Sequence, residues 1–274
     1  MLDILLHVLP ASLYALLAIH FWRSRRPAAA KSTQNGLRMW ERAALLVGIA
    51  LQGFGLYRDL FQGDAMHFGF AYALALMLWL ALLVYWIESL YAQLEGLQTL
   101  VLPAAALCAL LPLVFPAQHT LEHVGSPVFR AHFAMAMLAY SLFTLAALHA
   151  LLMATAEKRL HKGRLSRALS SLPPLLTMES LLFRLVLIAF IMLTLTLGSG
   201  ILFSETLFGK PMAFNHKTVF AIVSWVIFAV LLIGRHAFGW RGRKALRWTL
   251  AGFITLLLAY VGSRFVLEII LGRA

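Results

Sequence analysis

The chain has 274 residues, of which 62% are hydrophobic and only 12% are charged. Soluble domains are about 45–50% apolar and about 25% charged, so this composition excludes a soluble globular enzyme. The apolar residues gather in runs of roughly 20, which is the length that a helix needs to cross about 30 Å of hydrocarbon. We therefore predict an all-α fold, a polytopic membrane protein built as a bundle of transmembrane helices.

Eight apolar runs follow one another between charged or turn-forming breaks. In chain order they predict membrane-spanning helices over residues 2–22, 43–58, 66–87, 97–116, 129–154, 182–203, 217–235 and 248–270. The two longest polar stretches, 23–42 and 155–181, are too short to hold a separate soluble domain. We therefore expect a single integral membrane domain over residues 1–274.

The charge distribution predicts the orientation of this bundle. The formal net charge is +12, from 23 Lys and Arg against 11 Asp and Glu. Sixteen of the basic residues fall on the side of the loops 23–42, 155–181 and 236–247, and six on the side of the two termini. By the positive-inside rule these loops lie in the cytoplasm and both termini lie outside. We assign the excess charge to the lipid bilayer as partner and expect no nucleic acid.

Several kinds of chemistry lack their residues in this sequence. The centres of the predicted helices carry almost no charged residue, unlike the relays of ion-coupled transporters. The sequence has no G-x-S-x-G elbow, no Walker A loop and no dinucleotide fingerprint. Its single cysteine, Cys108, excludes an internal disulfide and a C-x-x-C pair. We therefore predict that the protein is not an enzyme.

Ten histidines remain as candidate ligands. Five of them are expected in outer loops or at outer helix ends: His67, His119, His123, His132 and His216. Imidazole is a common axial ligand of haem iron and a good ligand for zinc or copper. The basic residues Arg58, Arg130 and Lys217 lie on the same side, where they can pair with haem propionates. Haem, a metal ion and a purely anchoring role of the histidines stay open at this point.

Two segments carry a family resemblance. Residues 131–141, AHFAMAMLAYS, and the stretch from 215 to 263, which includes NHKT, GWRGR and YVGS, resemble the membrane-embedded cytochrome c assembly family of CcsA-type haem-handling proteins. The likeness covers a core of approximately residues 97–270. Within the family the chain is most similar to the shorter HemX/YpjD-like branch, because residues 203–214 contain no tryptophan and thus no WWD loop.

The resemblance implies a multi-pass protein of the bacterial inner (cytoplasmic) membrane that binds or relays haem. His132 falls on the first external histidine of the family. No histidine follows Tyr260 to supply the second external ligand, and His216 is the nearest substitute. The cofactor implied is haem b, held by His132 and His216 with Arg130 or Lys217 facing its propionates. Other cytochrome maturation or membrane proteins are the expected partners.

Two other functions remain alternatives. The chain can be a non-enzymatic membrane scaffold or regulator, such as an accessory of tetrapyrrole synthesis, that has lost haem binding; the missing WWD loop favours this reading. It can also be a small-solute or metal-ion permease with the outer histidines as an entry site. The uncharged helix centres count against the permease.

The orientation is testable by cysteine labelling in intact cells, in a variant whose Cys108 is replaced by Ala. A membrane-impermeant thiol reagent is expected to spare a cysteine introduced at Ser32 or Ser166 and to modify one introduced at Gln118. The reverse pattern would show that the bundle is inverted, and the outer histidines would then face the cytoplasm.

Overall fold

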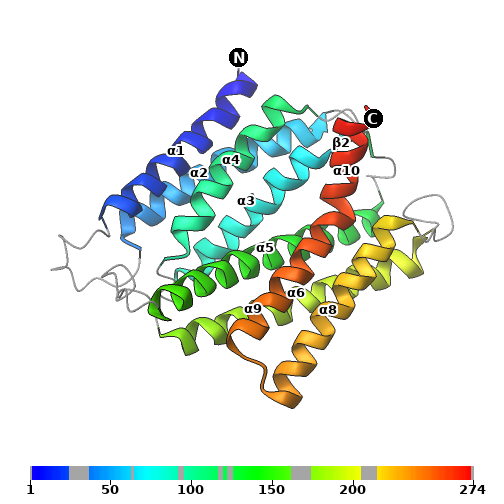
Figure 1. Cartoon of the computed structure of the whole chain (residues 1–274). Coiled ribbons are helices and arrows are strands. Elements are labelled where there is room, and N and C mark those ends of the chain that lie inside the picture. The colour runs from blue at the N-terminus through cyan, green and yellow to red at the C-terminus, as the bar shows by residue number, and fades with distance from the viewer. Residues whose placement is uncertain are drawn as a thin grey trace.

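The computed structural model of the protein describes residues 2–24, 37–62, 65–91, 96–116, 120–121, 126–161, 174–204 and 215–272. Each predicted span is a helix in it, and the helices lie side by side (Figure 1). Their bounds are α1 (Leu2–Ser24), α2 (Met39–Leu60), α3 (Phe70–Glu88), α4 (Gln98–Val114), α5 (Pro127–His161), α6 (Leu175–Leu202), α8 (His216–Phe238) and α9 (Gly242–Leu257).

The last helix begins with α9, and beyond α9 its winding changes from α to π. It runs through the π-helical turn η2 (Leu258–Gly262), the short α10 (Ser263–Phe265) and a second π-helical turn, η3 (Val266–Ile270). In the described part of the chain, seven helical stretches are long and apolar enough to cross a membrane, while α4 has 17 residues and is shorter. The prediction of an all-α polytopic membrane protein is confirmed.

The predicted span 66–87 begins too early. Met66 and His67 belong to the strand β2 (Ala65–His67), which pairs antiparallel with β1 (Phe61–Gln62) and β3 (Thr120–Leu121). The sequence analysis predicts no strand here. Helix α3 begins only after Gly69, whose extended backbone at φ −130° and ψ −174° separates the strand from the helix.

Two other helices extend further than predicted. Helix α5 continues to His161, and α6 begins at Leu175, directly after Pro174. The added turns are more polar than the predicted spans because the headgroup regions, which widen the bilayer to about 40–45 Å, also accommodate helix. A run of apolar residues reveals only the part of such a helix that crosses the hydrocarbon, so the predicted spans stop short of these turns.

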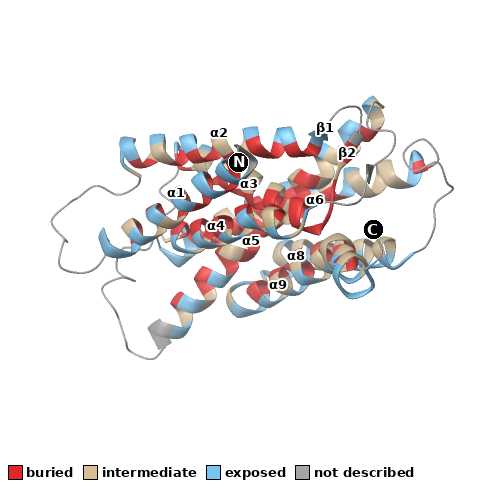
Figure 2. Cartoon of the chain, turned by 90° about the horizontal axis from the view of Figure 1, so that it is seen from above, coloured by how far each residue is buried: buried red, intermediate tan, exposed pale blue. Residues whose placement is uncertain are grey.

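Helix α5 lies at the centre of the bundle. It packs against α3 on one side and against α6 and α9 on the other, while α1 packs on α2 and α4 (Figure 1). In an 18-residue apolar stretch of α5 67% of the residues are buried, compared with 22% in the corresponding stretches of α6, α8 and the last helix. Figure 2 shows the buried residues gathered along the inward faces. Side chains on α5 are therefore placed by neighbours on both sides.

Both termini lie at the same end of the bundle (Figure 1). We call it the outer end, because the charge distribution predicts that it faces outside. The small β1-β2-β3 sheet also lies at this end. In the chain, β1 and β2 lie between α2 and α3, and β3 lies between α4 and α5. His119, His123 and most of the loop 203–214 lie outside the described residues, as do the basic segments 25–36 and 162–173.

Close contact between α5, α8 and α9 depends on a glycine. The rings of Phe143 and Phe228 stack with centroids 3.8 Å apart. A Cβ on Gly252 of α9 would lie 2.7 Å from Cζ of Phe228. The Ser224 hydroxyl also donates to the Gly252 carbonyl at 3.0 Å, so the two helices meet through backbone as well as side chain.

Replacement of Gly252 by Ala is therefore expected to destabilise the bundle. The new methyl group must displace the Phe143–Phe228 stack, and overpacking of this kind costs about 1–3 kcal/mol. Thermal unfolding of the purified protein in mild detergent measures the effect. Gly198→Ala is the matched control, because a Cβ on Gly198 meets nothing within 4 Å. Equal melting temperatures for the two variants would contradict this packing.

Candidate functional site at the outer end

His132 lies near the start of α5, and its ring is oriented by α6. The ring atom Nδ1 is 2.8 Å from Oγ of Ser199. The Ser199 hydroxyl donates its single proton to the carbonyl of Thr196 at 3.0 Å. The serine oxygen must therefore accept from the imidazole, so the Nδ1 of His132 carries the proton and Nε2 carries the lone pair. The protein fixes the tautomer of His132 through one serine.

This tautomer is the one that a metal-ligating histidine needs. Such histidines donate one ring N–H to a neighbouring acceptor, which fixes the ring and leaves the other nitrogen to bind the metal. Ser199 supplies that acceptor here. His132 thus has, at Nδ1, the hydrogen-bond arrangement of a metal-ligating histidine.

An aromatic cluster lies beside His132. The ring of the next residue, Phe133, is 5.1 Å from Phe68 in an edge-to-face contact and 6.1 Å from the stacked ring of Phe129. Phe68 in turn lies 5.7 Å from Tyr260 on η2. We call Phe68, Phe129, Phe133 and Tyr260 the aromatic cluster. It connects the start of α5 with the segment after β2 and with the last helix; Phe68 and Phe129 are buried in it, while Phe133 and Tyr260 are half-buried.

His216, the second predicted ligand, contacts a different helix from the one that His132 contacts. It is the first residue of α8, it is exposed, and its Nε2 lies 3.2 Å from Oγ of Ser263 on α10. Asn215 caps this helix by accepting from the backbone N–H of Thr218 at 3.1 Å. Among the residues that the structure describes, no hydrogen bond or ring contact joins His132 to His216. The two histidines are held on different helices.

The two predicted basic partners, Arg130 and Lys217, also lie in different surroundings. Arg130 lies exposed on the first turn of α5. The ammonium group of Lys217 lies over the ring of Tyr260, 5.9 Å from its centroid, within the range of a cation–π contact. Lys217 also interacts electrostatically with Arg264 and Glu268 on the last helix. Of the four predicted site residues, Lys217 is the one that the structure joins to the aromatic cluster through Tyr260.

Glu268 is a site residue that the sequence analysis missed. Its carboxylate accepts from the backbone N–H of Phe70 at 3.3 Å, across 198 residues of sequence. Helix α3 begins after Gly69, which has no side chain to cap it, and Oε2 of Glu268 lies 2.8 Å from the position of a Cβ on Gly69. Glu268 therefore caps α3 and fixes the last helix to the outer sheet. The only signal in the sequence is an acidic residue in an otherwise apolar run.

Four buried polar atoms at this end have no hydrogen-bond partner within the described residues. They are Oη of Tyr260, Nε of Arg264, Oε1 of Glu268 and Nδ1 of His67. Buried polar groups are normally satisfied, so a group of unsatisfied ones marks a place where another molecule binds. The described residues hold no cluster of three or more metal-ligating side chains, so the arrangement does not indicate a bare metal ion.

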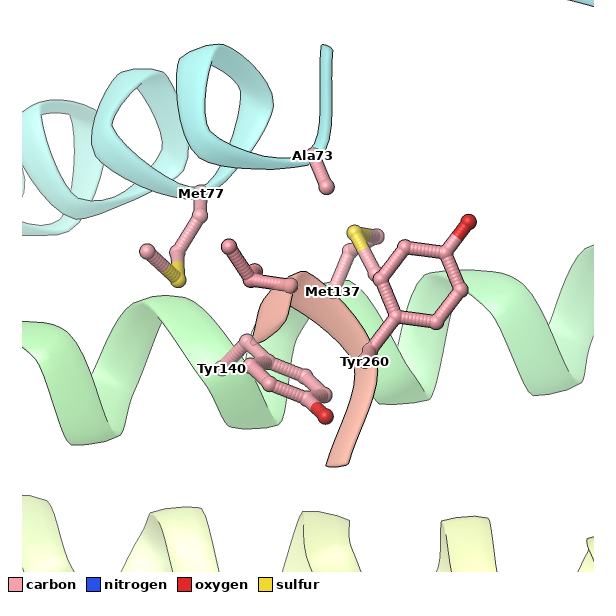
Figure 3. Close-up of a pocket in the computed structure, with 6 residues that line it drawn as sticks. Ala73, Met77, Met137, Tyr140 and Tyr260 are labelled. Atoms are coloured by element: carbon pink, nitrogen blue, oxygen red, sulfur yellow. The ribbon is translucent and has the colours of Figure 1, made fainter. Parts of the chain in front are cut away.

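An apolar crevice opens beside Tyr260. Met77, Met137, Tyr140 and Tyr260 converge there between α3, α5 and η2 (Figure 3). The Tyr140 hydroxyl donates to the carbonyl of Leu256 at 3.0 Å, next to the point where the helix changes from α to π winding. The space between these side chains is too narrow to admit a water molecule, so it is a packing seam and holds no ligand in this structure.

Together these features define a polytopic helical membrane protein with a polar and aromatic site at its outer end. The sequence model of the family described as cytochrome C assembly protein matches residues 39–271. The chain belongs to the cytochrome c assembly protein family, as the resemblance predicts. The match also includes α2 and α3, which precede the core of 97–270 that the quoted motifs cover.

Individual relatives agree with this assignment. The chain is 34% identical over 155 residues to "Inner membrane protein YpjD" of Escherichia coli (strain K12), and the match covers 57% of this chain and 58% of the relative. It is 32% identical over 143 residues to an uncharacterized 28.8 kDa protein of Azospirillum brasilense, covering 52% of each. A segment of 89 residues is 34% identical to "Cytochrome c biogenesis protein CcsA" of Prochlorococcus marinus (strain MIT 9301), covering 32% of this chain and 29% of that protein.

The match to the YpjD protein thus covers just under three fifths of the relative's length. No solved structure matches the chain. The relative's name and the seven membrane-crossing helices of the described residues confirm the predicted multi-pass location in the inner membrane.

Proposed function

We propose that this protein binds one b-type haem at its outer end, with His132 as an axial ligand, and that it handles haem during cytochrome c assembly. The observation that carries the proposal is the Ser199–His132 hydrogen bond, which leaves the lone pair of the imidazole on Nε2. His132 is half-buried, and this bond orients its ring from α6. Family membership, and a relative named for cytochrome c biogenesis, support the same role.

The residues around His132 fit a haem. A porphyrin is flat and apolar, and Phe133 and Tyr260, the half-buried members of the aromatic cluster, are rings of the kind that pack against it. Its propionates need cations or hydrogen-bond donors near the headgroup level, where Lys217 lies. Bound haem would supply the iron chemistry. The chain's own part is to orient the imidazole, to cover the ring and to hold the propionates.

We also propose that the protein makes no bonds itself. The sequence lacks the motifs of acyl transfer and nucleotide hydrolysis, and its single thiol, on Cys108, is set within the apolar helix α4. The partners that follow from this role are the bilayer, haem and other proteins of cytochrome maturation.

A second candidate is a membrane scaffold or regulator that has lost haem binding. It is favoured by the absence of tryptophan from residues 203–214 and by the attachment of His132 and His216 to different helices. The two candidates differ in one observable, which is the presence of haem in the purified protein.

The test is the absorption spectrum of the protein purified in mild detergent after expression with added haem precursor. The wild type is expected to show a Soret band that His132→Ala abolishes or shifts, because the iron loses an axial nitrogen. His236→Ala is the control, since His236 is exposed at the opposite end of α8 and should leave the band unchanged. If His216 is the second axial ligand, His216→Ala shifts the band as well.

A colourless wild type would contradict haem binding and favour the scaffold. A coloured protein that is indifferent to His132→Ala would place the iron on another outer histidine, of which His67 has a buried, unpartnered Nδ1.

A further inference from the structure

We propose that Lys217, Tyr260 and Arg264 form a cradle for the carboxylate groups of the porphyrin. The inference rests on the proposed function in that it takes a porphyrin as the ligand. It goes beyond that function by adding Tyr260 and Arg264 of the last helix to Lys217 of α8 as carboxylate contacts, with Arg264 in the role predicted for Arg130.

The three side chains are held together by contacts between α8 and the last helix. Lys217 lies over the ring of Tyr260. Arg264 follows Tyr260 by four residues and is near enough to interact with it electrostatically. One residue before Lys217, His216 bonds to Ser263, which fixes the start of α8 against α10. The cradle therefore spans two helices whose relative position is set by side-chain contacts on both sides.

The charge balance leaves the cradle positive. Lys217 and Arg264 supply two cations, and within the described part of the chain Glu268 is the carboxylate that interacts with both. That carboxylate is already engaged at the N-terminus of α3, where its Oε2 accepts from Phe70. A second anion is thus needed to balance the two cations. It would be attracted from the outer side.

The unsatisfied donors point to the same ligand chemistry. The Tyr260 hydroxyl and the Arg264 Nε–H are buried and make no hydrogen bond of normal geometry among the described residues, although the two side chains lie close enough to attract one another. Both are donors that suit a carboxylate, and an arginine offers it a planar pair of N–H groups. A ligand carboxylate in the cradle would satisfy the two donors and neutralise the surplus charge at once.

Tyr260 connects the cradle to an apolar binding surface. Its ring is a member of the aromatic cluster and also lines the crevice with Met77 and Met137 (Figure 3). A ligand that meets the cradle with a carboxylate therefore places its apolar body against Tyr260 and Phe133, the two half-buried rings of the aromatic cluster. A porphyrin with propionates on one edge has this shape. An anionic lipid headgroup shares the charge but brings acyl chains instead of a flat ring.

The test measures binding of protoporphyrin IX without iron to the full chain in neutral detergent, followed by porphyrin fluorescence. Without iron, ligation by His132 does not contribute. Arg264→Gln and Lys217→Gln are each expected to weaken binding by about tenfold, the effect of losing one charge-assisted hydrogen bond. Tyr260→Phe, which keeps the ring, should weaken it by a few fold. Arg130→Gln is the matched control and should stay within about twofold of the wild type.

A second ligand without free carboxylates distinguishes the contribution of the carboxylates to binding from that of the porphyrin ring. The dimethyl ester of protoporphyrin should bind the wild type about as weakly as the free acid binds Arg264→Gln. His132→Ala should keep its affinity for protoporphyrin IX even where it loses the Soret band of haem. Failure of haem ligation by His132 is thus distinguished from failure of the cradle.

Three results would overturn the proposal. The first is equal affinity of the wild type for the acid and the ester, and the second is an effect of Arg130→Gln as large as that of Arg264→Gln. The third is the absence of porphyrin binding together with binding of phosphatidylglycerol that Arg264→Gln weakens, which would make the occupant a lipid headgroup. Circular dichroism of each variant confirms that its helices are retained.

Discussion

The hydrocarbon of the bilayer offers no hydrogen-bond partner, so every polar group in a spanning helix must be met by the chain itself. This constraint explains how the helices of the bundle are joined. His7 of α1 lies 2.7 Å from Asp59 of α2 and 3.1 Å from the carbonyl of Ala109 in α4, so one buried ring connects three helices. Trp79 donates to the carbonyl of Ile49 at 2.7 Å and joins α3 to α2 in the same way. The packing that places α5 at the centre depends on such contacts as well as on apolar burial.

Among the described residues, buried side-chain atoms without a partner occur within the bundle, as at Tyr14, Gln52 and His149, and also at the outer end. Tyr260, Arg264 and Glu268 keep buried atoms without partners among the described residues, although they lie on one face of the same helix. Polar and charged groups near the membrane are costly and mark ligand sites more often than structural ones. His132 differs from them because its Nδ1 is satisfied by Ser199 and its second nitrogen is directed by that bond. The proposed site thus combines a histidine whose Nδ1 is satisfied with donors that have no acceptor among the described residues.

The fold could be read from the sequence because hydrocarbon thickness sets a helix length that apolar runs reveal directly. His132 was found through the resemblance of residues 131–141, and the family match agrees with it. What the sequence does not reveal are contacts between distant residues. Ser199 lies 67 residues from His132, and Glu268 lies 198 residues from Phe70, so no local pattern announces either bond. The π-helical turn at Tyr260 is equally hidden, since its winding is fixed by contacts such as that of Tyr140 with Leu256.

The central claim is that Nε2 of His132 binds the iron of a haem. Pulsed electron paramagnetic resonance of the ferric protein, grown with ¹⁵N-labelled histidine, observes the nitrogen on the iron directly. The account predicts a hyperfine coupling from a histidine ¹⁵N in the wild type that is lost in His132→Ala and kept in His236→Ala. A haem signal without ¹⁵N coupling, or a coupling that His132→Ala leaves unchanged, would contradict it.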